Sequence, residues 1–456
     1  MTLRTMILLV ALLLPISGRG NALVDITSHG ALGDGKTLNT KALQAAVDQC
    51  AAQGGGTIMV PAGTFLTGSV ELKSNITLSL GPGAVLRGSG RIEDYPPIPF
   101  RHNELGPVRS LLWSIGQADL CITGSGVIDL NDSAFIDFNE YRSDPGMASG
   151  VALDDAQRQE TVASHAAPRP TQPLFFRHCQ RVRIDGVTFR NAPCWTITLA
   201  LCRDVKLSQL TIDNNLRTPN CDGIHCCASK DVIITDSLIS AGDDCIALTS
   251  ITDWEEVCEN IVVANCILTS RSAAIRIGHE ASKVRNVAVS NIIVKDTNRG
   301  IAIFARDKGW VENVRIDNAL IRTRLFAGGW WGKGEPLVLC ARGSGHIAGI
   351  AMTNVRAESE NSILVVGQEK NIRDVELRDW SLELKYGRNR PIFKPLYELS
   401  PAANIPAPDP THHIPWLYAA DIQGLRAANV RCVRTEDEPG FSIEPVTIRV
   451  EDLDLE

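Results

Sequence analysis

Several signatures of common protein classes are missing from this 456-residue chain. It has no Cys-x-x-Cys pair and no His-Glu-x-x-His motif, so the sequence predicts neither a bound metal nor another cofactor. Its 13 cysteines are odd in number and scattered, which argues against a small disulfide scaffold; several, such as Cys202 and Cys245, fall inside apolar strand patterns and are expected to be buried thiols. The net charge of −7 provides no basic field for nucleic acid.

The N-terminal apolar run, Met6 to Ile16, is too short for a membrane-spanning helix. Arg4 precedes it and the small residues of Gly20–Ala22 follow it, a pattern typical of a signal peptide over residues 1–22. A buried first strand or a membrane anchor is the alternative. We therefore expect a secreted or periplasmic protein, monomeric and free of the membrane after cleavage, whose single domain spans residues 23–456.

Helical periodicity is clear in one segment of the mature chain. Apolar residues at helical spacing predict a helix from Asn39 to Gln53, which Gly54–Gly56 would end. From Thr57 onward the pattern changes to short alternating strands, with no second clear helix. We expect the helix to cover the open end of a stack of strands, whose edge would otherwise pair with other chains.

A repeat of apolar or small residues at x, x+2, x+5 and x+7 runs down the chain. It begins at Val182, Val205, Val232, Ile261, Val287, Val314, Ile350 and Val375. Turn-forming residues often separate x+2 from x+5, so each unit is expected to be a strand, a tight turn and a strand. Leucine-rich and helical repeats share the period, but their signatures are missing. The repeat predicts an all-β fold, a single-stranded right-handed parallel β-helix whose coils stack about 4.7–4.9 Å apart.

Two segments interrupt the coils. Asn131 to Pro173 is polar and aperiodic, and we expect an extended loop over one face. Gly328 to Pro336 contains Trp330 and Trp331, candidates for a sugar-stacking platform because aromatic faces cover the apolar faces of sugars. The alternative for both tryptophans is a loop tucked against the barrel. Pro391 to Pro415 is rich in proline and irregular.

Three carboxylates, Asp222, Asp243 and Asp244, lie where two successive strands begin. The repeat places Asp222 and Asp244 one coil apart. Because side chains alternate along a strand, it also predicts that His225 and Asp243 face solvent. Like charges a few ångströms apart raise one pKa, as a general acid requires. Two carboxylates about 6.5–9.5 Å apart around a glycosidic bond leave room for water and give inversion. Aspartate is also common in solenoid turns and as a calcium ligand, so the residues alone leave these alternatives open.

The motifs around these acids resemble those of glycoside hydrolase family 28, the polygalacturonases and their relatives. The resemblance covers nearly the whole mature chain and rests on Gly30–Thr37, Gly54–Thr57, Val60–Phe65, Trp195–Ile197, Asn220–Asp222 and Asp243–Asp244. It implies a right-handed parallel β-helix that hydrolyses pectin-like polysaccharide or its oligosaccharides with inversion, usually without metal. By resemblance, Asp243 is the general acid, and Asp222 and Asp244 hold and activate the attacking water.

Two signatures of that family are altered in this chain. Ser272-Ala273 stand where the family has a histidine, and His279 lies on the far side of the following strand, so we do not equate the two. The family's Arg-Ile-Lys signature, which binds the substrate carboxylate, is replaced by Ala302-Ile303-Phe304. The resemblance therefore implies intact water-activating acids beside an altered site for the uronate group.

A local excess of basic residues between Arg271 and Lys308 suggests what could replace that site. We expect Arg276 and Arg306, both at outward parity, to bind substrate, and His225 and His279 to hydrogen-bond sugar. An ordinary solvated surface is the alternative. Two other functions also stay open: a polysaccharide lyase on the same fold, with the aspartates as calcium ligands, and a non-catalytic carbohydrate-binding β-helix.

Overall fold

The computed structural model describes residues 22–103, 105–141, 152–165, 168–250, 256–390, 399, 414–434 and 440–456. The expected signal peptide, except for Ala22, lies outside the described residues, as does most of the irregular stretch from Pro391 to Pro415. Within these ranges, no helix has the length and apolar character needed to cross a membrane.

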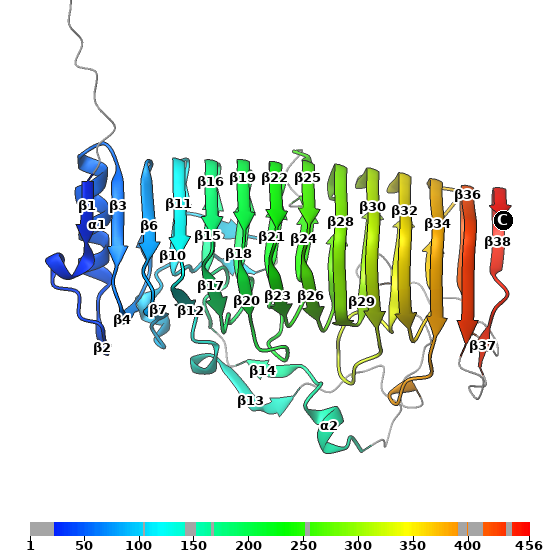
Figure 1. Cartoon of the computed structure of the whole chain (residues 1–456), viewed down its shortest axis with the longest axis horizontal. Helices are drawn as coiled ribbons and strands as arrows, with labels where there is room; N and C mark the ends of the chain where they lie inside the picture. The colour runs from blue at the N-terminus through cyan, green and yellow to red at the C-terminus, as the bar shows by residue number, and fades with distance from the viewer. Residues whose placement is uncertain are drawn as a thin grey trace, which may run out of the picture.

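Thirty-two of the described strands form one sheet that coils along the long axis of the molecule, and every pairing within it is parallel (Figure 1). The coil has three faces, which we call A, B and C. Face A consists of β5 (Val70–Glu71), β10 (Leu112–Ile115), β15 (Leu174–Arg177), β18 (Ile197–Ala200), β21 (Ile224–Cys227), β24 (Ile246–Thr249), β27 (Ala273–Ile277), β29 (Arg299–Arg306), β31 (Glu335–Arg342) and β33 (Ile363–Val366).

From β5 onward, faces B and C follow face A in each coil. Face B consists of β1 (Ala22–Asp25), β3 (Gly56–Val60), β6 (Ile76–Leu80), β11 (Ala118–Gly124), β16 (Gln180–Asp185), β19 (Arg203–Ser208), β22 (Lys230–Thr235) and β25 (Cys258–Ala264). Face C consists of β2 (Asp34–Leu38), β4 (Gly63–Thr67), β7 (Ala84–Gly88), β12 (Val127–Asp129), β17 (Thr188–Arg190), β20 (Thr211–Asp213), β23 (Leu238–Ala241) and β26 (Ile267–Ser270). Six longer strands complete the stack: β28 (Lys283–Thr297), β30 (Trp310–Thr323), β32 (His346–Ser359), β34 (Ile372–Leu384), β36 (Leu417–Arg434) and β38 (Val446–Leu455).

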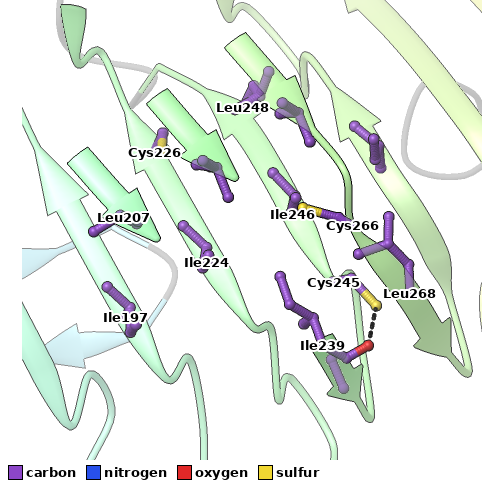
Figure 2. Packing of buried hydrophobic residues seen from close by; sticks show 14 of the residues in the cluster. Ile197, Leu207, Ile224, Cys226, Ile239, Cys245, Ile246, Leu248, Cys266 and Leu268 are labelled. Atoms are coloured by element: carbon purple, nitrogen blue, oxygen red, sulfur yellow. Dashed lines mark hydrogen bonds between the residues drawn. The ribbon is translucent and has the colours of Figure 1, made fainter. Parts of the chain in front are cut away.

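The predicted parallel β-helix is therefore confirmed, and so is the register of its repeat. The eight template positions that begin at Val182 pair in order down the stack as far as Val375. Their side chains belong to one continuous buried apolar core. Figure 2 shows the same stacking on face A, where Ile197, Ile224 and Ile246 follow one another from coil to coil.

The tight turns between x+2 and x+5 use one residue in the left-handed region. Gln209, Asp236, Asn265, Asn291 and Asn318 occupy it in successive coils, with φ between 54° and 56°. The side-chain amides of Asn265, Asn291 and Asn318 each donate a hydrogen bond to the turn residue one coil earlier, at 2.8–3.2 Å. Asparagine and aspartate tolerate this conformation, which explains the turn residues that the sequence places there.

The expected helix is present as α1 (Thr40–Ala52), with Leu43, Ala46, Val47 and Cys50 buried. It contacts β1, β3, β5 and β6, and so covers the N-terminal end of the coil (Figure 1). The expectation of no second helix was wrong, because α2 (Asp155–Arg158) forms inside the insertion. Its four residues carry no apolar periodicity, but a capping box between Asp154 and Gln157 fixes its start.

The insertion between the coils projects from one edge of the stack, where β13, β14 and α2 lie below the strands in Figure 1. It contains the antiparallel pair β13 (Ile136–Tyr141) and β14 (Ala163–His165). The remaining short elements are β8 (Arg101–His102), β9 (Gly106–Pro107), β35 (Ile414–Pro415), β37 (Phe441–Ser442), η1 (Ile26–His29), η2 (Ile92–Asp94) and η3 (Asp132–Ala134).

Candidate active site

The three predicted acids meet at the start of face A strands. Ile224 of β21 pairs with Ile246 of β24, so Asp222 and Asp244 stand at the same level one coil apart, as expected. The backbone fixes this level, since the N–H of Gly223 donates to the carbonyl of Asp244 at 2.9 Å. Ala273 occupies the same level in the next coil.

Asp222 belongs to a buried polar chain. Its Oδ2 lies 3.0 Å from Nδ1 of His225, and Nε2 of His225 lies 3.0 Å from the hydroxyl of Thr249. The imidazole also packs against Trp195, with the ring centroids 3.8 Å apart. Only 2% of His225 is exposed, so the expectation that its parity faces solvent was wrong. The imidazole orients Asp222 because both of its nitrogens have fixed neighbours.

Asp244 is held by the following coil. Its Oδ1 accepts a hydrogen bond from the N–H of Ala273 at 3.1 Å, and its Oδ2 accepts one from Nε of Arg276. Nη2 of Arg276 also lies 3.8 Å from Oδ2 of Asp222, so one guanidinium stands between the two carboxylates. Burial disfavours the charged guanidinium, but Asp244 and Asp222 outweigh it and raise the pKa of Arg276 above its ordinary value.

Asp243 has a different environment from its two neighbours. Burial, followed by the charges of Asp222 and Asp244, raises the pKa of Asp243 well above its usual range. Arg276 and a hydrogen bond with Ser272 act in the opposite direction without cancelling this rise. Asp243 therefore favours its protonated form, whereas Asp222 and Asp244 both lie next to the charged guanidinium of Arg276.

The predicted tryptophan pair divides into two roles. Trp331 is 37% exposed, and its ring stacks on His279 with the centroids 6.2 Å apart and 21° between the planes. Its backbone is fixed by Asn298, whose Nδ2 donates to the carbonyl of Trp331 at 3.0 Å. Trp330 is buried and its indole N–H donates to the carbonyl of Glu160, so the expectation that Trp330 offers a free stacking face was wrong.

The structure does not bring Arg306 to the acids. Arg299, at the start of β29, is the residue level with Ala273, whereas Arg306 lies at the other end of that strand. There it is paired with Glu280 and Asp307, each at 3.1 Å.

The expected basic patch is largely neutralised among the described residues. Arg276, Arg285, Arg299 and Arg306 all lie within 4 Å of carboxylates. Within the same described ranges, no group of three or more histidine, cysteine or acidic side chains is placed to hold a metal ion.

Ser272, which lowers the pKa of Asp243, was missed as a candidate site residue, because the sequence marks it only as a replacement for a family histidine.

Apolar side chains cover the outer side of face A on both flanks of the acids. Toward the N-terminus, Phe175 and Ala200 are buried with Ile98 of a preceding loop. Toward the C-terminus, the outward residues Ala302 and Phe304 are fully buried in a cluster with Val338, Leu364, Leu399 and Tyr418. Because these clusters cover face A, side chains that point outward from the coil, such as Phe304, are buried rather than exposed.

Comparisons with known proteins show what this chain is similar to. The model of glycosyl hydrolases family 28 matches residues 146–389, and that of rhamnogalacturonase A/epimerase, pectate lyase-like proteins matches residues 23–85. A probable polygalacturonase of Vitis vinifera is 29% identical over 327 residues, which cover 66% of this chain and 61% of the relative. An exo-poly-alpha-D-galacturonosidase of Dickeya chrysanthemi is 29% identical over 311 residues, covering 61% and 51%. The chain thus spans about half to three-fifths of these relatives' own length.

Solved structures support the fold. The family 28 exopolygalacturonase of Yersinia enterocolitica has a TM-score of 0.70 and 21% identity, covering 94% of this chain and 78% of that one. An exopolygalacturonase of Thermotoga maritima has a TM-score of 0.59 and 21% identity, covering 94% and 92%.

Proposed function

Because this chain belongs to glycoside hydrolase family 28, whose model matches more than half of its residues, we propose that it is an inverting O-glycoside hydrolase of pectin-like polysaccharide or its oligosaccharides. The observation that carries the proposal is the contrast within one cluster. Asp243 has a raised pKa, while Asp222 and Asp244 are held by His225 and Arg276.

In the proposed reaction, Asp243 donates its proton to the glycosidic oxygen as the bond from that oxygen to the anomeric carbon breaks. A water held by Asp222 and Asp244 attacks the anomeric carbon from the opposite face and loses its proton to one of these carboxylates. A single displacement of this kind inverts the anomeric configuration. Arg276 keeps the two carboxylates in place and limits their mutual repulsion.

Substrate contacts are proposed for three side chains: Arg276, which binds Asp244, and the stacked pair His279 and Trp331. Arg276 is 6% exposed, and its guanidinium N–H groups are proposed to bind an oxygen of the sugar. The exposed indole of Trp331 offers an apolar face, and His279 stacked on it can hydrogen-bond a hydroxyl group. His225 supports Asp222 from beneath in this proposal, and Arg306 lies outside the site.

We further propose that the enzyme attacks chain ends. The apolar clusters on the two flanks reach β21 through Cys227 and β27 through Ala273, so at most these two strands and β24 lie between them. Three strands span roughly 10–15 Å at the spacing of a β-sheet. A site of this width suits the end of a polysaccharide better than a long internal stretch of it. The names of the Dickeya, Yersinia and Thermotoga relatives, all exo-acting, support the same mode. Release of single sugars or short fragments from the first turnovers tests it, whereas an early mixture of long fragments would contradict it.

Replacement of Asp243 by asparagine tests the hydrolase directly. Asp243→Asn removes the donated proton and is expected to lower kcat by about 10²–10⁴, the usual contribution of a general acid. The loss should be much smaller on an aryl glycoside, whose leaving group needs no protonation. Asp236→Asn is the matched control, because it makes the same change at an exposed turn where asparagine preserves the bond from Asn265. An unchanged kcat in folded Asp243→Asn would contradict the proposal.

A further inference from the structure

Three segments that are distant in sequence build the surface that carries Trp331, which we call the sugar-binding wall. One is the insertion around α2, the second is the loop between β30 and β31, and the third follows β34. Their meeting point is Glu160, which is 5% exposed and lies just after α2. The sequence shows no pattern linking these segments, so only the three-dimensional arrangement identifies the junction.

The carboxylate of Glu160 accepts four hydrogen bonds. Its Oε1 accepts from Arg324 at 2.8 Å and from Arg388 at 2.6 Å. Its Oε2 accepts from the backbone N–H of Ala327 at 3.1 Å and from Asn389 at 2.7 Å. We call these five residues the Glu160 hub. Burial alone would raise the pKa of Glu160, but the bonds from Arg324, Ala327 and Asn389 lower it below its ordinary value.

The hub extends directly to the tryptophan loop. The backbone carbonyl of Glu160 accepts the indole N–H of Trp330 at 2.7 Å, one residue before the exposed Trp331. Thus Ala327 and Trp330 are both bound to the same residue, on either side of Gly328-Gly329. Glycine pairs lose much conformational freedom on ordering, so this stretch depends on such anchors.

A second contact joins the loop to the coil of the acids. Two guanidinium groups pack on the fully buried ring of Phe326, with Cζ of Arg324 3.8 Å and Cζ of Arg271 4.0 Å from its centroid. Arg271 directly precedes Ser272, the hydrogen-bond partner of Asp243. The loop is therefore fixed to the insertion through Glu160 and to the active-site coil through Arg271.

We propose that Glu160 is a positioning residue for the sugar-binding wall: through Ala327 and Trp330 it holds Trp331 against His279 beside β27, where an uncharged apolar sugar face stacks on the indole. The inference rests on the proposed hydrolase function. Glu160 touches no reacting atom, and its effect on catalysis passes through Trp331.

Glu160→Gln is the test variant, because it preserves size but removes the charge that binds two arginines. KM is expected to rise about three- to tenfold, the size of one aromatic stacking contact, with kcat changed by less than about twofold. Trp331→Ala should raise KM similarly, and Glu160→Gln should add nothing further in that background. Glu259→Gln is the matched control: Glu259 is also bound by two cations, Lys230 at 2.7 Å and Arg285 at 2.6 Å, but on face B.

An unchanged KM in Glu160→Gln, or a KM effect that multiplies with that of Trp331→Ala, would overturn the inference. Hydrogen exchange of the Ala327 amide in the free protein separates this outcome from failure of the hydrolase proposal. Faster exchange in Glu160→Gln, but not in Glu259→Gln, is expected whether or not a substrate has been found. Unaltered exchange in Glu160→Gln would refute the positioning role even if the enzyme proved to be a hydrolase.

Discussion

Removal of one hydroxyl group beside Asp243 should shift the pH range of catalysis. Ser272 is level with Asp243 one coil later, and its hydrogen bond to Asp243 lowers the pKa of that carboxyl group. Ser272→Ala removes an interaction that favours the ionised carboxylate, so the pKa of Asp243 should rise further. Hydrogen bonds to charged groups contribute about 1.5–3 kcal/mol and 1.36 kcal/mol corresponds to one pKa unit, but Ser272 affects this pKa less than burial, the neighbouring carboxylates or Arg276, so we expect a rise of up to about one unit.

The assay is the dependence of kcat/KM on pH. Activity requires protonated Asp243, so the alkaline limb lies at its pKa and should move upward by up to about one unit in Ser272→Ala. Ser237→Ala is the control, since Ser237 is equally buried but bonds only to the backbone of Leu210 and Thr235. An alkaline limb that stays in place or moves downward in Ser272→Ala would refute the assignment of Asp243 as the acid.

Three further predictions concern stability and the tryptophan loop. Burial raises the pKa of Glu360 from 4.5 to about 7, so the folded state keeps a proton that the unfolded state releases, and stability falls as pH rises between these values. Glu360→Gln should therefore stabilise the protein by up to about 3 kcal/mol at pH 8 and by little at pH 4 in denaturant titrations; equal effects at both pH values would contradict this. Asn291→Ala should cost about 2–3 kcal/mol through strain at φ 54° and two lost side-chain hydrogen bonds, and Asn291→Gly clearly less; equal losses would exclude the strain. Trp330→Ala should lower the free energy of unfolding by about 3–5 kcal/mol because the ring is buried, whereas Trp331→Ala should hardly change it.

The fold was predictable because coil spacing leaves a direct trace in the sequence. In a β-helix every inward residue stacks on one a period away, so positions such as Val182 and Val205 repeat visibly. The same logic placed Asp222 and Asp244 one coil apart. Periodicity distinguishes inward from outward side chains, but it does not show what covers the outward ones. His225 is buried beneath Trp195, which comes from the preceding coil, so its predicted exposure was wrong.

The wall of the site was less predictable, because long-range polar contacts build it. Trp330 and Trp331 are adjacent and flanked by glycine on both sides, and nothing local indicates which one is buried. The carbonyl of Glu160 decides it by accepting the indole N–H of Trp330. Likewise, the outward parity of Arg276 was predicted, but its pairing with Asp244 depends on the register of two coils.

The most direct test of the proposed mechanism is the anomeric configuration of the product at the moment of cleavage. Proton NMR of the first product, recorded before mutarotation, reports whether the anomeric bond is inverted. Protonation by Asp243 with attack by water held at Asp222 and Asp244 predicts the inverted anomer. A retained configuration, or an unsaturated sugar from elimination, would contradict the assigned roles of all three carboxylates.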